Sequence, residues 1–546
     1  MEDTIERSAS MPAVSGLLAS ASLLTACGGG GGGATTSSQE PTASQPSETI
    51  SSLQASRFLA QASMGATREA IARVQAIGYS AWLDEQIAMP ATQSRWDWLV
   101  SKGFNAIGNK NSQAGIDSAV WRKLLSSPDT LRQRVTLALS EIVVASLDGF
   151  TGSWSAFTGA AYMDILEVNA FGNYRTLLQQ ITLSVSMGEY LTYRRNAKAD
   201  PKTGSMPDEN YAREILQLFT IGLVMLNADG TATTQETYTQ ADISGLARVF
   251  TGWDQDLAGG TTDTPDYKQR PMTQVASKYE AGEKVFLGTT IAAGTDAATC
   301  LSKALDAIFA HQNVAPFISR QLIQRLVTSN PAPAYVARVA AVFNNNGKGV
   351  KGDLKAVVKA ILLDQEARSA TGATSTSFGK VREPILRFAA WARAYNAASP
   401  SDAWAIGNTT DPSTRLGQSP LRSPSVFNFF RPGYVPPALG VAAPEFQIVN
   451  ESSVVGYVNY MQNAISKGVG DVKADYAALL PMADNVPALV DEINVVLAAG
   501  QLGPDSVTLI RNAVAGMATG SDAARANRVY AALTLVMASP EFIVQK

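Results

Sequence analysis

Apolar residues recur at spacings of three and four along most of the chain from Ser51 onward, which is the pattern of helices that bury one face. Residues suited to helix starts support this pattern. Thr67 precedes one apolar segment, and Ser205 stands three residues before Asp208, as in a capping box. The clearest helical segments are 68–87, 128–146, 173–191, 314–327 and 355–364. The sequence therefore predicts a mainly α-helical, multi-helix body.

The region 254–289 interrupts this pattern. It is rich in Gly, Thr, Asp and Pro, has no helical period, and leads into a short segment at 284–291 that suits a strand. We interpret it as an excursion that carries a small β-hairpin between two helical lobes, 51–253 and 290–546.

A second irregular segment, 398–440, is too apolar and aromatic to be a solvated loop. Long loops in compact bodies are often functional, and otherwise they pack as arms. Arg422 and Arg431 lie here among aromatic side chains, which are Phe427, Phe429, Phe430 and Tyr434. This set suits a groove for a carbohydrate or an anion, and it also suits the packing of an aromatic arm.

The first 27 residues are predicted to be a signal peptide. The segment 11–27 is apolar and too short for a membrane-spanning helix, although the residues before it are largely acidic where such peptides are usually basic. The segment ends in Leu-Thr-Ala-Cys, which resembles the lipobox of bacterial lipoproteins, so Cys27 is the predicted lipidation site. A plain signal peptide with an incidental cysteine is the alternative.

The lipobox resemblance implies an exported protein that a lipid holds at the membrane. Gly28 follows Cys27, where an Asp would favour the inner membrane, so we expect the outer membrane, with the protein facing the periplasm or the cell surface. Residues 28–50 are rich in Gly, Ser, Thr and Pro and predict a disordered tether of about 25 to 30 Å. The folded domain is then 51–546.

Composition and motifs exclude several classes of function. The formal net charge of -3 gives no broad basic surface for nucleic acid. His311 is the single histidine, which excludes multi-histidine zinc centres and makes any Ser-His-Asp triad depend on it. The sequence also lacks a GxSxG nucleophile motif and a glycine-rich phosphate-binding loop. His311 can cap a helix, fill a gap in the core, or act as a general acid or base.

The stretch PDENYAREILQLFTIGL, at 207–223, gathers polar side chains on one face of a helix. At about 100° per residue, one arc holds only polar residues, which are Glu209, Asn210, Arg213, Glu214 and Gln217. The apolar residues fill the opposite arc. A solvated face accounts for this separation without any function, because Glu209 and Arg213, four residues apart, form only a weak pair when exposed.

Three other interpretations of this stretch stay open. Glu209 and Glu214 can act as acid and base with Arg213 beside them. Asp200, Asp208 and Glu209 can supply oxygen ligands for Ca²⁺, and the helix start can bind an anion. Alternatively, Arg213 and one glutamate form a buried ion network that joins the lobes. No other cofactor is predicted.

The chain resembles the bacterial family called "domain of unknown function 1800". The stretch at 207–223, followed by YTQADISGLARVFTGW at 238–253, is similar to the family's central signature. Further similar segments are RFLAQASMGAT (57–67), LRQRVTLALSEIVVAS (131–146), YEAGEKVFLG (279–288), HQNVAPFISRQLIQRLV (311–327), LGQSPLRSPSVFNFF (416–430) and ASPEFIVQK (538–546). Glu209, Arg213 and Glu214 match the signature. Asp208 replaces its usual Asn, and Tyr279-Glu280 replaces its usual His-Asp, which weakens the case for a histidine-based site.

The resemblance implies an exported protein to whose family no activity is assigned. Members are often paired genetically with the "domain of unknown function 1501" family, which resembles alkaline phosphatases and sulfatases, so we expect an exported partner of that kind. Two hypotheses follow. The first is a helical binding or scaffold module of the cell envelope that acts with this hydrolase-like partner. The second is a surface hydrolase that acts on envelope or extracellular polymers through Glu209 and Glu214. The single histidine and the missing nucleophile motif favour the first.

Overall fold

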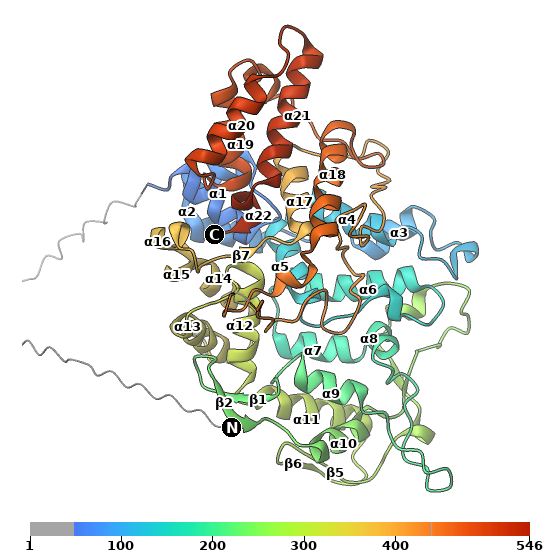
Figure 1. Cartoon of the computed structure of the whole chain (residues 1–546). Coiled ribbons are helices and arrows are strands. Elements are labelled where there is room, and N and C mark those ends of the chain that lie inside the picture. Colours follow the sequence, from blue (N-terminus) through green and yellow to red (C-terminus); the bar gives the residue numbers. More distant parts are fainter. Residues whose placement is uncertain (1–48, 438) are drawn as a thin grey trace, which may run out of the picture. The chain divides into compact units, whose positions relative to one another are not determined.

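Helix α5 (Thr130–Ser140) lies at the centre of the computed structural model, which describes residues 49–437 and 439–546. Its side chains are buried almost without a break from Leu131 to Leu139. It contacts α2 (Arg68–Ala88), α6 (Ser155–Val168) and α12 (Val314–Leu326), as Figure 1 shows. The predicted signal peptide, Cys27 and nearly all of the predicted tether lie outside the described residues.

The mainly helical fold that the sequence predicts is confirmed. The other α-helices of the described part are α1 (Ser52–Ala62), α3 (Arg95–Ser101), α4 (Ile116–Ser126), α7 (Tyr174–Thr182), α8 (Val185–Tyr190), α9 (Asn210–Gln217), α10 (Gln240–Ala247), α11 (Ala297–Ala310), α13 (Pro333–Asn344), α14 (Leu354–Leu363), α15 (Gln365–Arg368), α16 (Ala370–Thr374), α17 (Pro384–Ala394), α18 (Glu451–Lys467), α19 (Val486–Ala498), α20 (Pro504–Ala515), α21 (Asp522–Ala538) and α22 (Pro540–Ile543). Short 3₁₀ helices are Ile107–Asn109, Leu147–Gly149, Arg248–Phe250, Asp266–Lys268, Ala276–Lys278, Pro444–Ile448 and Leu480–Met482. None of the helices described is long and apolar enough to cross a membrane.

Helix starts follow the predicted capping chemistry in part. The Thr67 side chain accepts a hydrogen bond from the Ala70 amide at the start of α2. The capping box predicted at Ser205 is wrong: Ser205 pairs with Asp200 in an isolated β-bridge, and α9 begins only at Asn210. The predicted helix 173–191 is divided into α7 and α8, because Ser184 caps a new helix.

Helix α5 is shorter than the predicted 128–146. It ends at Ser140, and a run of β-branched residues, Ile142 to Val144, follows outside helical conformation. Such residues lose side-chain freedom in a helix, which favours an end here. Glu141 therefore lies just past the helix end, where it turns into the protein interior.

Within residues 49–437 and 439–546, the strands form four two-stranded antiparallel sheets. They are β1 (Val224–Leu226) with β2 (Ala232–Glu236), β3 (Trp253–Asp254) with β4 (Thr273–Gln274), β5 (Lys284–Phe286) with β6 (Thr289–Ile291), and β7 (Lys380–Val381) with β8 (Val544–Gln545). The hairpin predicted near 284–291 is confirmed as β5–β6. The sequence did not predict β1–β2, because β2 is polar and mostly exposed and lacks alternating apolar residues.

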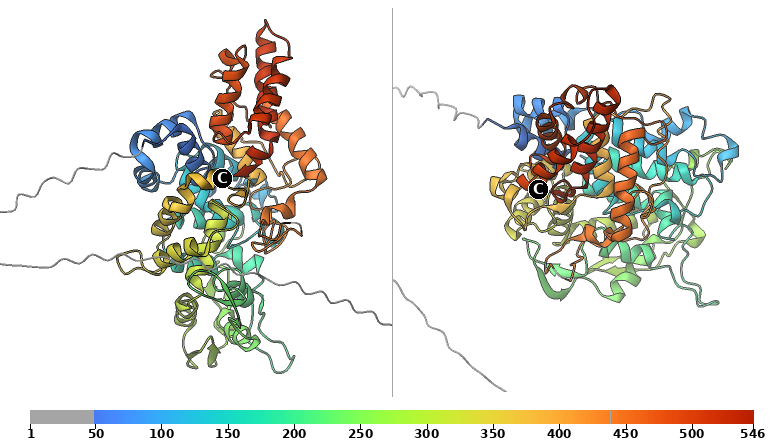
Figure 2. Two further views of the ribbon diagram at one scale, coloured as in Figure 1. Left: turned by 60° about the vertical axis from the view of Figure 1, so that its left-hand side comes forward. Right: turned by 45° about the horizontal axis from the view of Figure 1, so that its top comes forward.

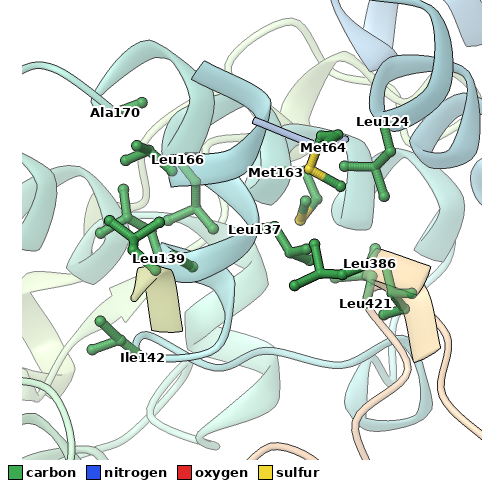
Figure 3. Packing of buried hydrophobic residues seen from close by; sticks show 14 of the residues in the cluster. Met64, Leu124, Leu137, Leu139, Ile142, Met163, Leu166, Ala170, Leu386 and Leu421 are labelled. Carbon is green, nitrogen blue, oxygen red and sulfur yellow. The ribbon is translucent and has the colours of Figure 1, made fainter. Parts of the chain in front are cut away.

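The hydrophobic core joins segments that are far apart in the sequence. Figure 3 shows Leu137 of α5, Met163 of α6 and Leu386 of α17 close to Leu421 from the irregular segment. Helix α1 contacts α19, and α17 contacts both α4 and α19. Figures 1 and 2 show α19, α20 and α21 side by side in red. By their contacts, residues Thr49–Lys546 group as one compact unit.

The segment 398–440, called the arm below, is packed against the helices over much of its length. The Leu421 carbonyl accepts a hydrogen bond from the Leu147 amide at 3.0 Å, and the Gly407 carbonyl accepts one from the Trp121 indole at 3.1 Å. Leu421 has φ 60°, a left-handed conformation that is strained for a leucine. Such strain persists only where the surroundings determine the backbone, so the arm has a fixed course at this point.

Candidate functional site

The polar side chains of the stretch 207–223 divide between the surface and the interior. Glu209 accepts hydrogen bonds from Gln240 Nε2 at 2.7 Å and from Ser244 Oγ at 2.6 Å, both on α10. The Arg213 guanidinium lies 3.5 Å from the Glu209 carboxylate, and these side chains are 42% and 32% exposed. Glu209 and Arg213 therefore join α9 to α10 at the surface, where such a pair contributes little to stability.

Glu214 is buried, by contrast, with 8% of its surface exposed. Its Oε2 has no hydrogen-bond partner among the described residues, and neither does the hydroxyl of Tyr238. Burial raises the pKa of Glu214, and the nearby Arg213 only partly opposes this. Glu214 shares no hydrogen-bond partner with Glu209 in the described part, and the buried ion network that was one interpretation of this stretch is not formed there.

The residues predicted to bind Ca²⁺ bond to nearby groups of the chain instead. Asp208 accepts hydrogen bonds from Thr192 Oγ1 at 2.7 Å and from the Asn210 amide at 2.8 Å. Asp200 accepts one from the Lys202 amide at 2.9 Å. Across residues 49–437 and 439–546, no group of three or more His, Cys, Asp or Glu side chains is arranged to hold a metal ion. Calcium binding through Asp200, Asp208 and Glu209 stays a prediction that this geometry does not support.

His311 lies in the turn between α11 and α12. Its Nδ1 accepts a hydrogen bond from the Asn313 amide at 3.1 Å. Burial lowers the pKa of His311, and the charge of Lys351 lowers it further. The Asn313 side chain donates to the carbonyls of Ile221 and Val224, each at 2.8 Å. This turn therefore fixes the start of β1, and the structure places His311 in a supporting position there.

A cavity of about 390 Å³ lies between the β1–β2 hairpin, α12, the end of α5 and the arm. Its lining is largely apolar and comes from Ile142, Leu218, Leu223, Val224, Leu226, Phe317, Val426 and Phe427. Gly222 also lines it with φ +73°, and a Cβ added there would approach the Phe317 ring to 2.8 Å. A volume and a lining of this kind are typical of small-molecule sites.

The polar side chains of the cavity wall are three arginines, three glutamines and one glutamate, so its charged groups are mostly cationic. Arg320 and Arg431 are exposed, and the Arg431 guanidinium stacks on the Phe427 ring at 4.6 Å from its centre. Arg325 and Glu141 are buried, with the Arg325 Nε 3.7 Å from a Glu141 carboxyl oxygen. The cavity therefore has exposed arginines on one part of its wall and a buried acid and base on another.

Glu141 also belongs to a buried charge cluster behind the cavity. Lys380 Nζ lies 3.2 Å from Glu383 and 3.1 Å from Glu445, and all three side chains are at most 3% exposed. Burial raises the pKa of Glu141 well above its usual value, the Glu383 carboxylate adds to this, and Arg325 and Lys380 oppose it. The Glu141 carboxyl therefore stays protonated to a higher pH than an ordinary glutamate.

The cavity was not predicted from the sequence, although the segments that line it were recognised. Four segments that carry the family resemblance contribute to its wall: 131–146, 207–223, 311–327 and 416–430. The available signal was the run RQLIQR in α12, which places Arg320, Gln321, Gln324 and Arg325 on a helix whose other side chains are mostly buried. That run indicates polar residues on a buried helix, but it does not show which residues of other segments lie next to them.

Comparison with known families agrees with the resemblance seen in the sequence. A family model described as "Protein of unknown function (DUF1800)" matches residues 57–544. No curated protein and no solved structure matches the chain.

Proposed function

Because the chain belongs to the DUF1800 family, whose description assigns no activity, we propose a function from its own geometry: it is a binding module that holds a small, largely apolar ligand in the cavity beside the arm. The observation that carries this proposal is the cavity of about 390 Å³ with its mostly apolar wall.

The exposure of the lining residues supports ligand entry from solvent. Leu223 and Val224 of the cavity wall are 55% and 36% exposed, although both are large apolar residues. An apolar ligand that covered them would remove this surface from water, which is favourable. Figure 1 shows that β1 and β2 lie beside α12, so the hairpin forms one side of the opening.

The hydrolase hypothesis has less support. Glu209 accepts two hydrogen bonds at the surface. Glu214 is buried, and no carboxylate of the described residues shares a hydrogen-bond partner with it. A pair of acid and base groups must both reach the same reacting bond. Nothing in the described part brings Glu209 and Glu214 to such a position.

The cellular setting is proposed from the sequence. Cys27 in its lipobox-like segment supports a lipid anchor at the outer membrane, and residues 28–50 support a tether between the lipid and the binding module. Incorporation of a labelled fatty acid that is lost in Cys27→Ala tests the anchor. Co-purification of an exported phosphatase-like or sulfatase-like protein with the lipidated chain tests the partner implied by the family resemblance.

Titration of the purified chain with N-phenyl-1-naphthylamine, a neutral apolar fluorophore, tests the binding function. We expect saturable binding to the native chain and an affinity at least about tenfold lower for Ala232→Trp, which fills the cavity from β2. The matched control is Ala513→Trp on the exposed face of α20. Equal affinities for the two variants, or no saturable binding to the native chain, would overturn the proposal.

A further inference from the structure

The ionisable groups that line the cavity are three arginines, Arg320, Arg325 and Arg431, and one acid, Glu141. Within the described residues, no carboxylate forms an ion pair with Arg320 or Arg431, and the Arg431 guanidinium donates no hydrogen bond. Arg320 donates one hydrogen bond, to the Gly230 carbonyl at 3.3 Å. The exposed part of the cavity wall therefore has an excess of positive charge with free donors.

The buried part of the wall holds one arginine, Arg325, and one acid, Glu141. Arg325 uses Nη1 and Nη2 for the carbonyls of Gln321 and Glu141, and its Nε has no hydrogen-bond partner among the residues described. In the described part of the chain, Glu141 is the one acid within ion-pair distance of Arg325, at 3.7 Å. Burial raises the pKa of Glu141, so this group is neutral over a wider pH range than an ordinary carboxylate.

We propose that the ligand of this cavity is an amphipathic anion, whose carboxylate or phosphate group binds Arg431 and Arg320 and whose apolar body lies against Leu218, Phe317 and Phe427. This inference rests on the proposed binding function and names the chemical class of the ligand.

The geometry of Arg431 suits it to this role. Its guanidinium is held over the face of Phe427, which restricts the side chain before a ligand arrives. A planar guanidinium with free donors can bind a carboxylate or phosphate through two parallel hydrogen bonds. The same aromatic ring also lines the cavity, so one residue pair contacts both the anionic group and the apolar body. Cations are disfavoured here, since the arginines repel them.

Competition between ligands with one common chain tests the inference. The native chain is loaded with N-phenyl-1-naphthylamine, and the fluorophore is displaced with dodecanoate, dodecyl phosphate, dodecanol or dodecyltrimethylammonium, each below its micelle concentration. We expect the two anions to compete at concentrations at least about tenfold lower than dodecanol, and the cation to compete worst. The ratio between dodecanoate and dodecyl phosphate distinguishes a fatty-acid head group from a phosphate head group.

Arg431→Gln should remove most of the preference for anions and leave the affinity for dodecanol nearly unchanged. The matched control is Arg525→Gln, a surface arginine of α21 outside the cavity, which should keep the native preference. Equal competition by dodecanoate and dodecanol in the native chain, or an unchanged preference in Arg431→Gln, overturns the anion inference while the binding function stands. Failure of the fluorophore itself to bind would overturn both.

Discussion

Arg422 and Asp117 form a two-point ion pair, with 2.7 Å from Nε to Oδ1 and 2.9 Å from Nη2 to Oδ2. Their side chains are 10% and 17% exposed, and the pair joins the arm to the first turn of α4. The two arginines that the sequence suggested for an aromatic groove thus have different positions. Arg422 holds the arm in place, whereas Arg431 stacks on Phe427 and lines the cavity.

Asp117→Asn should destabilise the protein by about 1 to 3 kcal/mol, because it leaves a largely buried guanidinium with weaker acceptors. Chemical denaturation measures the change. The control is Asp484→Asn, which removes the acid of an exposed pair with Arg525 and should change stability by less than about 0.5 kcal/mol. If both variants lose the same free energy, the Arg422 pair is not a fixed attachment of the arm.

Gly245 of α10 packs directly against the backbone of β5, and a Cβ placed there would lie 1.8 Å from the Val285 carbonyl oxygen. Gly245→Ala must therefore move α10 and β5 apart, at a cost of about 1 to 3 kcal/mol. Amide hydrogen exchange should show faster exchange in β5 and β6. At Gly108 an added Cβ meets nothing within 4 Å, so Gly108→Ala is the control. Native exchange rates in Gly245→Ala would contradict the close contact.

The helical class and several helix starts could be predicted because they depend on local pattern. The start of α2 after Thr67 follows from spacing and capping alone. The end of α5 could not be predicted in this way: Glu141 continues a helical pattern, and its true environment comes from Glu383 and Arg325, which are remote in sequence. The cavity was missed for the same reason, since its wall combines segments that no local pattern connects.

The stretch 207–223 shows how far periodicity can go at a candidate site. It correctly separated a polar face, on which Glu209 and Arg213 are exposed. Glu214 lies at the border of that face, and whether a border residue is buried depends on what packs beside it. Here the neighbouring segment brings Tyr238 close to Glu214: burial raises the pKa of the Tyr238 hydroxyl, and the Glu214 carboxylate adds to this while Arg213 opposes it.

Glu214→Gln should leave the stability at pH 7 unchanged or raise it. Among the residues described, Glu214 has no ion pair to lose. The folded protein holds Glu214 with a raised pKa, so ionising it costs free energy that glutamine avoids. Above the pKa that Glu214 has in the unfolded chain, the folded protein binds more protons than the unfolded chain does. The stability of the native protein therefore falls as the pH rises through the pKa of Glu214 in the folded state. Denaturation at pH 5 and pH 7 measures this. A loss of about 3 kcal/mol or more at pH 7 would reveal an ionic partner that this arrangement lacks.

The buried carboxyl of Glu141 should also make the protein less stable as the pH rises, as is expected for Glu214. Its folded pKa is raised well above 4.5 by burial and by Glu383, with Arg325 and Lys380 in opposition, so the folded state keeps a proton that the unfolded chain releases. Stability from this group is fully present below the unfolded pKa and is lost as pH rises through the folded pKa, by at most about 1.4 kcal/mol per pH unit. Because the Glu383 carboxylate affects the ionisation of Glu141, the transition belongs to the pair.

Glu141→Gln isolates this contribution, since a glutamine side chain has nearly the shape of a protonated glutamic acid but cannot ionise. The difference in unfolding free energy between the variant and the native protein should be small near pH 4.5 and should increasingly favour the variant as pH rises. The other carboxylates contribute equally to the pH dependence of both proteins, so their contributions cancel in the difference between the two unfolding free energies. A difference that stays constant from pH 4.5 to pH 8 would mean that Glu141 ionises in the folded protein much as it does in the unfolded chain. The buried wall of the cavity would then carry a negative charge opposite Arg325.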